Sequence, residues 1–150
     1  MFCNQCEQTS KGTGCLTVGV CGKKPEVAAL LDLLTYSISQ LSEAARQARS
    51  KGVVDSGLNH LTTSALFVTL TNVNFDPDAI EKYIRDVTAK IDELAVKAGI
   101  DTRLVIKPAS DVTGLVKQGE ELGYPGSQEK NPDIRSLKEL LLYGLKGVAA

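Results

Sequence analysis

The chain has 150 residues, of which 43% are hydrophobic, 23% are charged and 5% are aromatic, and its net charge at pH 7 is −1. This much apolar material can form a core without disulfide staples. The sequence has no basic block, no tryptophan and no apolar run near the ~20 residues that span a bilayer, so we expect neither nucleic acid nor a membrane as a partner.

All four cysteines lie within the first 24 residues, at Cys3, Cys6, Cys15 and Cys21, with the spacing C-x2-C-x8-C-x5-C. The start of the chain lacks the charged and apolar regions of a secretory leader, so we expect a cytoplasmic protein, in which clustered cysteines usually bind metal. Structural zinc sites usually use two close cysteine pairs, and only Cys3 and Cys6 form one here. The wider gaps favour an iron–sulfur cluster, with zinc or two disulfides as alternatives.

The residues between the cysteines suit a bulky anionic group. Glycine lets the backbone approach a cluster and aim N–H groups at sulfur, and four glycines lie here: Gly12, Gly14, Gly19 and Gly22. Lysine also outnumbers acid in this stretch, which contains Lys11, Lys23, Lys24 and Glu7. The formal excess of positive charge would partly offset the negative charge of four thiolates.

Two helices are predicted next. Pro25 suits a first helical turn and Gly52 a helix end, and apolar residues recur between them at helical spacing: Val27, Leu30, Leu31, Leu34, Ile38, Leu41, Ala45 and Ala48. Asp55 or Ser56 can cap the second helix. Its apolar stripe, broadened by Phe67 and Leu70, fades near residues 72–74 and contains Leu58, Leu61, Ala65, Val68 and Asn72. The single histidine, His60, is expected on the helix surface, because no cysteine, acidic residue or second histidine lies at helical spacing from it to complete a metal site.

A third helix should begin at Asp76-Pro77-Asp78 and end at Gly99, since an acidic cap followed by proline is a strong helix start. Its buried stripe contains Ile80, Tyr83, Ile84, Val87, Ile91, Leu94 and Ala98. Three amphipathic helices joined by short turns predict a three-helix bundle over residues 25–99.

Residues 100–150 follow a different pattern. The segment 104–106 is apolar and could be extended, Ser110 or Asp111 can cap a short helix that ends at Gly123, and Asn131 opens a last helix. That helix carries three consecutive leucines at 140–142, so we expect it to be buried on several sides. It reaches Ala150 without a stop signal, and we expect that the chain is cut inside a helix. The predicted fold is all-α: a cysteine loop (1–24), the three-helix bundle (25–99) and the start of a second helical subdomain (100–150).

Several stretches resemble one family. MFCNQCEQT, GTGC and GVCGKKPE are similar to the N-terminus of hybrid-cluster proteins, also called prismane proteins or hydroxylamine reductases. GVVDSGLNHLTTSALFVTLTNVNFDPDAI resembles the N-terminal helical region of that family, and LGYPGSQEKNPDIRSLKELLLYGLKGVAA resembles the stretch that follows it. The resemblance covers essentially all of the chain. It implies that Cys3, Cys6, Cys15 and Cys21 bind a cubane [4Fe–4S] cluster, because the family group with a [2Fe–2S] cluster has wider gaps.

The resemblance also implies a function. The family reduces hydroxylamine to ammonia, and nitric oxide reduction is also attributed to it. Its substrate binds a hybrid 4Fe–2O–2S cluster held by histidine, glutamates and cysteines of later domains. No cysteine follows Cys21 here, so we expect that cluster only in a missing C-terminal part, and no catalytic residue in this chain.

The chain would then be the electron-transfer module of an oxidoreductase, without activity of its own. The expected partners are an external redox donor protein or reductase and the remaining domains of the full-length enzyme. The leucine-rich last helix also predicts self-association of the fragment. The alternative is a zinc-stabilised helical interaction module without redox activity.

Overall fold

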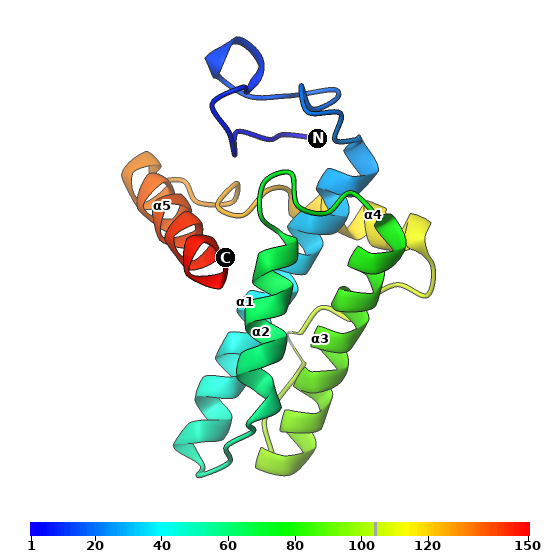
Figure 1. Ribbon diagram of the computed structural model, residues 1–150. Coiled ribbons are helices and arrows are strands. Elements are labelled where there is room, and N and C mark those ends of the chain that lie inside the picture. Colours follow the sequence, from blue (N-terminus) through cyan, green and yellow to red (C-terminus); the bar gives the residue numbers. More distant parts are fainter. Residues whose placement is uncertain (104) are drawn as a thin grey trace.

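The computed structural model describes residues 1–103 and 105–150 and confirms the all-α fold (Figure 1). The α-helices are α1 (Pro25–Ser50), α2 (Gly57–Val68), α3 (Pro77–Ala98), α4 (Val112–Leu122) and α5 (Pro132–Ala149), and a 3-10 turn, η1 (Ser10–Gly12), lies in the cysteine loop. Within the described residues the β-type pairing is limited to one bridge, between Cys3 and Cys15. Of the apolar segment predicted to be extended, Leu104 lies outside the described residues, and Val105 and Ile106 have irregular backbone.

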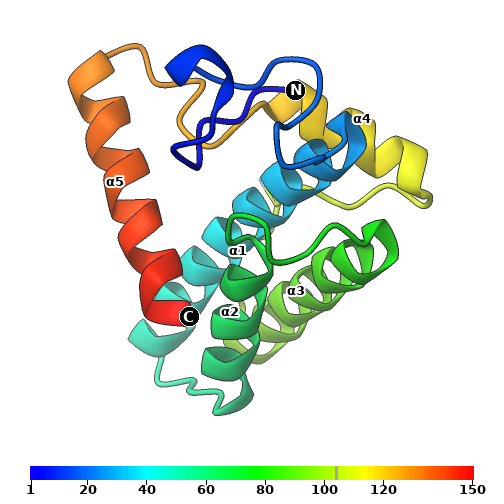
Figure 2. The same cartoon turned by 45° about the horizontal axis from the view of Figure 1, so that its top comes forward.

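Helix α1 is the central element, and α2, α3 and α4 all pack against it (Figure 2). Pro25 occupies its first turn and Gly52 follows its end with a φ of 78°, as predicted. All eight residues of the predicted stripe are buried. The helix also buries Leu33, Ala28 and Ala44, which lie off that stripe, because neighbours cover it on more than one side.

Helix α2 is shorter than predicted. The side chain of Asp55 accepts hydrogen bonds from the N–H groups of Gly57 (2.9 Å) and Leu58 (3.2 Å), so Asp55 provides the cap. The helix ends at Val68, and Asn72, predicted to continue its stripe, instead adopts a left-handed φ of 62° in the following turn. Phe67, predicted to broaden the buried face, is exposed.

Helix α3 begins and ends as predicted. The Asp76 carboxylate accepts from the N–H of Asp78 at 3.0 Å, Pro77 follows the cap, and Gly99 ends the helix in the left-handed conformation. Helix α4 is capped by Asp111, whose carboxylate accepts from the N–H of Gly114 at 2.7 Å. Both helices contribute to one core with α1.

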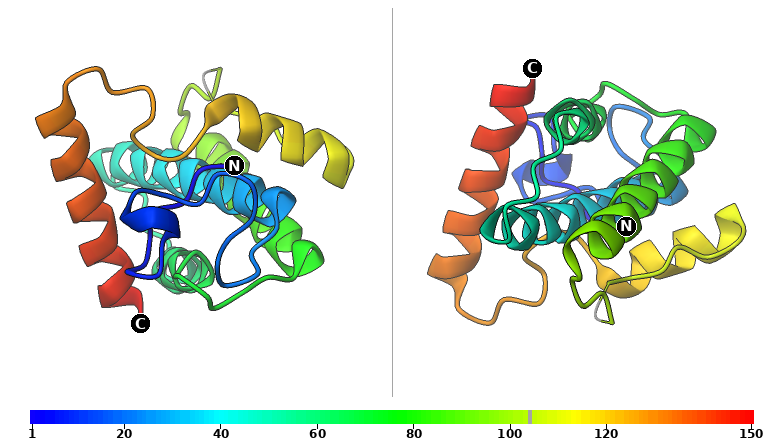
Figure 3. Two further views of the ribbon diagram at one scale, coloured as in Figure 1. Left: turned by 90° about the horizontal axis from the view of Figure 1, so that it is seen from above. Right: turned by 90° about the horizontal axis from the view of Figure 1, so that it is seen from below.

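Helix α5 differs from expectation in its burial. Its start is confirmed, since the Asn131 side chain accepts from the N–H groups of Asp133 and Ile134. Its leucines, however, are exposed, with Leu140 at 67% and Leu141 at 64%, and its one buried residue is Lys146. The helix is therefore not buried on several sides here, because α5 stands beside the bundle and packs mainly on α2 (Figure 1). Exposed leucines are what the sequence predicts for this stretch of chain on its own. The cysteine loop covers the N-terminal end of α1, with α5 at one side (Figure 3).

Candidate metal centre

Backbone pairing places the first and third cysteines opposite each other. The N–H of Cys3 donates to the carbonyl of Cys15 at 3.1 Å, and the N–H of Cys15 donates back at 2.8 Å. The 3-10 turn between them contains Lys11 and Gly12, both with positive φ. The hydroxyl of Thr9 donates to the carbonyl of Cys3 at 2.9 Å. These contacts turn the first 15 residues into a closed loop.

Cys15 is the one buried cysteine, and its surroundings favour the thiolate. The backbone N–H of Ser10 lowers the pKa of the Cys15 thiol most, followed by the N–H of Val20, against the opposing effect of burial. The positive charge of Lys23 adds to the effect. N–H groups aimed at sulfur together with a nearby cation are the environment of a thiolate that binds metal.

The other three thiols are only partly buried, and all four cysteines are free thiols, not disulfides. Cys21 lies beside Gly19, where a Cβ atom would come 3.0 Å from the cysteine sulfur. In residues 1–103 and 105–150, no group of three or more metal-ligating side chains is already gathered around one point. The donor set still suits an iron–sulfur cluster chemically, since four thiols lie on one loop and one thiolate is stabilised.

Residues distant in the sequence hold the loop in place. The hydroxyl of Thr71, after α2, donates to the backbone carbonyl of Gln5 at 3.2 Å. The hydroxyl of Tyr143 on α5 donates to the side-chain oxygen of Asn4 at 3.2 Å. The ring of Phe2 packs on Tyr124 with a centroid distance of 4.7 Å. Three later segments therefore anchor the first five residues.

Three charged groups lie beneath the loop. Lys23 and Lys146 are 2% and 3% exposed, and Asp32 on α1 is partly buried. Burial raises the pKa of Asp32 to about 7, although Lys146, Lys23 and the N-terminal amine oppose the shift. Burial also lowers the pKa of Lys146 to about 8, assisted by Lys23 and opposed by Asp32 and Cys3. Sequence patterns do not predict this cluster, although Asp32 is the one charged residue within the apolar run 27–34.

The raised pKa of Asp32 predicts a pH-dependent stability. The folded chain binds the Asp32 proton below about pH 7, whereas an unfolded aspartate releases it near pH 3.9. Stability from this group is therefore lost as the pH rises through that window. Asp32→Asn should stabilise the metal-free chain by on the order of 2 kcal/mol at pH 8 and by much less at pH 4.5.

Urea unfolding at both pH values measures this effect. The exposed Glu120, on α4, provides the matched control, and Glu120→Gln should leave the pH dependence unchanged. A gain from Asp32→Asn that is equal at both pH values would contradict the assignment.

His60 is exposed on α2, as predicted. In the described part of the chain, no group of potential metal ligands forms around its imidazole. His60 is therefore a surface residue of the bundle.

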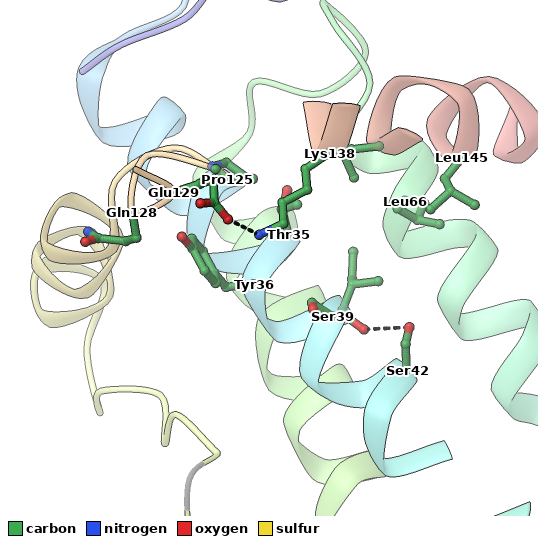
Figure 4. Close-up of a pocket in the computed structure, with 13 residues that line it drawn as sticks. Thr35, Tyr36, Ser39, Ser42, Leu66, Pro125, Gln128, Glu129, Lys138 and Leu145 are labelled. Atoms are coloured by element: carbon green, nitrogen blue, oxygen red, sulfur yellow. Dashed lines mark hydrogen bonds and ion pairs between the residues drawn. The ribbon is translucent and has the colours of Figure 1, made fainter. Parts of the chain in front are cut away.

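A cavity of about 580 Å³ lies between α1, α2, α5 and the loop that precedes α5 (Figure 4). Its lining is mainly apolar and contains no cysteine. The hydroxyls of Thr35 and Ser42 donate to backbone carbonyls of their own helix at 2.8 and 2.9 Å, and Lys138 pairs with Glu129 at 2.6 Å. These polar groups already have partners and are not available to bind or activate a ligand. The cysteine loop is therefore the better candidate site. No described helix has the length and apolar character required to cross a membrane.

Comparison with known proteins connects this loop to a family. The Prismane/CO dehydrogenase family matches residues 1–150. The chain is 49% identical to the hydroxylamine reductase of Maridesulfovibrio salexigens over 151 residues, 46% identical to that of Methanocella arvoryzae over 159, and 47% identical to that of Syntrophobacter fumaroxidans over 158. These alignments cover 100% of the chain but only 28%, 29% and 29% of the three relatives. The chain belongs to the Prismane/CO dehydrogenase family.

Proposed function

We propose that this chain is the N-terminal electron-transfer part of a hydroxylamine reductase and that Cys3, Cys6, Cys15 and Cys21 bind a [4Fe–4S] cluster. The observation that carries the proposal is the buried Cys15 sulfur, whose thiolate is favoured by two backbone N–H groups. The three further thiols lie on the same loop, and the cysteine spacing favours a cluster over a single zinc ion. When bound, such a cluster accepts and releases single electrons.

The protein residues around the loop would hold the cluster and its charge. The N–H groups of Ser10 and Val20 stabilise negative charge on the Cys15 sulfur. Thr71 and Tyr143 fix the first cysteine pair relative to the helices through Gln5 and Asn4. The bundle would thus hold the part of the loop around Cys3 and Cys6 rigid. A rigid ligand loop limits the structural reorganisation that accompanies electron transfer.

An external redox protein is the proposed electron donor. Leu16, Val18 and Val20, between the third and fourth cysteines, expose 67%, 54% and 61% of their surfaces, and the exposed Lys11 and Lys24 lie on the same loop. A small apolar centre with a charged rim suits the weak, transient complexes of electron carriers. We propose an acidic carrier, in the cytoplasm.

The reduction of hydroxylamine to ammonia would belong to further domains of a longer protein. The exposed leucine face of α5, which includes Leu137, Leu140 and Leu141, is the surface on which we propose that such domains pack. The same face would make this chain self-associate when it is alone.

Redox spectroscopy on anaerobically prepared protein tests the proposal. A broad visible absorbance that dithionite bleaches reversibly, by one electron per chain, is the expected result. A colourless protein that contains zinc and no sulfide would contradict it and support the zinc-stabilised interaction module.

A further inference from the structure

Two lysine ammonium groups are buried near the cysteines, one at the end of the cysteine loop and one on α5. Lys23 follows the last cysteine, and its Nζ lies 5.8 Å from the centroid of the Phe75 ring. Lys146 lies on α5, and its Nζ donates to the backbone carbonyl of Thr69 at 2.9 Å. A buried ammonium is costly unless an anion matches it, so the position of both groups requires an electrostatic explanation.

The nearby protein groups do not supply a full countercharge. Among the described residues, neither Lys23 nor Lys146 forms an ion pair with a carboxylate. Asp32 is the acid that acts on both, and its pKa of about 7 leaves it only partly ionised at neutral pH. The N-terminal amine faces the same carboxyl group and adds positive charge. Glu139 on α5 lines the same small cavity as Asp32. Two lysines and the N-terminal amine therefore face two carboxylates, so cations outnumber acids beneath the loop.

The cysteines lie within the field of these groups. Tyr143, three residues before Lys146 on α5, donates to the side chain of Asn4, next to Cys3, at 3.2 Å. Cys3, Asp32 and Tyr143 line the same small cavity of about 30 Å³. The neighbouring Tyr143 on α5 has its pKa raised by burial, then by Glu139, Cys3 and Cys6. The ends of α5 and of the loop that carry these groups thus lie close together.

We propose that Lys146, with Lys23, is an electrostatic positioning residue that favours the reduced form of the centre held by the cysteine loop. This inference rests on the proposed function. Reduction by an external one-electron donor adds one negative charge to the centre, and a fixed ammonium nearby stabilises that added charge. Removal of the Lys146 charge should make reduction harder.

A purely structural role is the competing explanation, since Lys146 also joins α5 to the end of α2 through Thr69. Lys146→Gln separates the two roles, because glutamine retains an N–H donor for that carbonyl and lacks the charge. Lys117, on α4, is 77% exposed and forms at most a 4.0 Å pair with Glu121, so Lys117→Gln is the matched control.

The first measurement is the midpoint potential of the cluster-loaded chain, titrated with mediators under argon. Lys146→Gln should shift the potential to a more negative value than in the unchanged chain, and Lys117→Gln should not shift it. Equal potentials in all three proteins would overturn the inference and leave the proposed function intact. If the unchanged chain assembles no cluster, the proposed function fails and the inference, which rests on it, fails with it; the second measurement tests independently the premise that the Lys146 charge is unmatched.

The second measurement is the thermal midpoint of the metal-free chain at pH 6, where Asp32 is mostly neutral. An unmatched buried charge should be destabilising there, so Lys146→Gln should raise the midpoint by about 2–4 °C. A lower midpoint in the variant would show that Lys146 is a structural tie and would overturn the inference.

Discussion

Replacing Cys15 by serine is expected to abolish iron binding while the helices stay folded. Serine has nearly the shape of cysteine, but its hydroxyl is a far poorer iron ligand than a thiolate. Cys15 is the buried cysteine of the loop, and two backbone N–H groups favour its thiolate. Iron should fall from about four to less than one atom per chain.

The helical scaffold should tolerate this change because the core is built from helix residues and not from the loop. The main core cluster contains α1, α3 and α4 residues such as Leu34, Ile84 and Leu115. Leu16→Ala, next to Cys15 in the chain, is the matched control, since Leu16 is exposed; it should retain its iron. Iron content and far-ultraviolet circular dichroism measure the two parts of the prediction. Full iron in the Cys15→Ser protein would rule Cys15 out as a ligand.

The second large effect is expected at Gly119, where α4 crosses α1. A Cβ atom on Gly119 would overlap the backbone carbonyl oxygen of Ala29 and lie 2.6 Å from the carbonyl carbon. Backbone atoms cannot rotate away as a side chain can, so Gly119→Ala should force the two helices apart. We expect a loss of about 3 kcal/mol in the free energy of unfolding and a thermal midpoint lower by about 6–12 °C.

Gly144 is the matched control for this prediction. It lies inside α5, and a Cβ atom added there would meet no other atom within 4 Å. Gly144→Ala should therefore gain about 0.5–1 kcal/mol from helix propensity alone. Thermal unfolding followed by circular dichroism compares the two variants. Similar midpoints for both would contradict the close crossing of α1 and α4.

The helix starts could be predicted from the sequence because each has a local chemical cause. Asp76 and Asn131 precede prolines, and their side chains cap the helices in the structure as the sequence indicates. The end of α2 could not be predicted in this way. Its carbonyl at Thr69 accepts from Lys146, a residue 77 positions later, so a tertiary contact helps to fix where the turn begins.

The sequence shows the four cysteines of the candidate site but not the groups that surround them. Four cysteines in one stretch are visible in the sequence, and so is the local excess of lysine. The roles of Tyr143 and Lys146 depend on how α5 returns to the cysteine loop, which no local pattern encodes. The three consecutive leucines of α5 fit no single apolar stripe, and nothing in the local pattern indicates that the buried residue on that helix is Lys146.

Iron and acid-labile sulfide per chain, measured on protein purified without oxygen, test the central claim most directly. The proposed function predicts about four irons and four sulfides, held by Cys3, Cys6, Cys15 and Cys21. One zinc ion without sulfide, or four free thiols without metal under the same conditions, would contradict it.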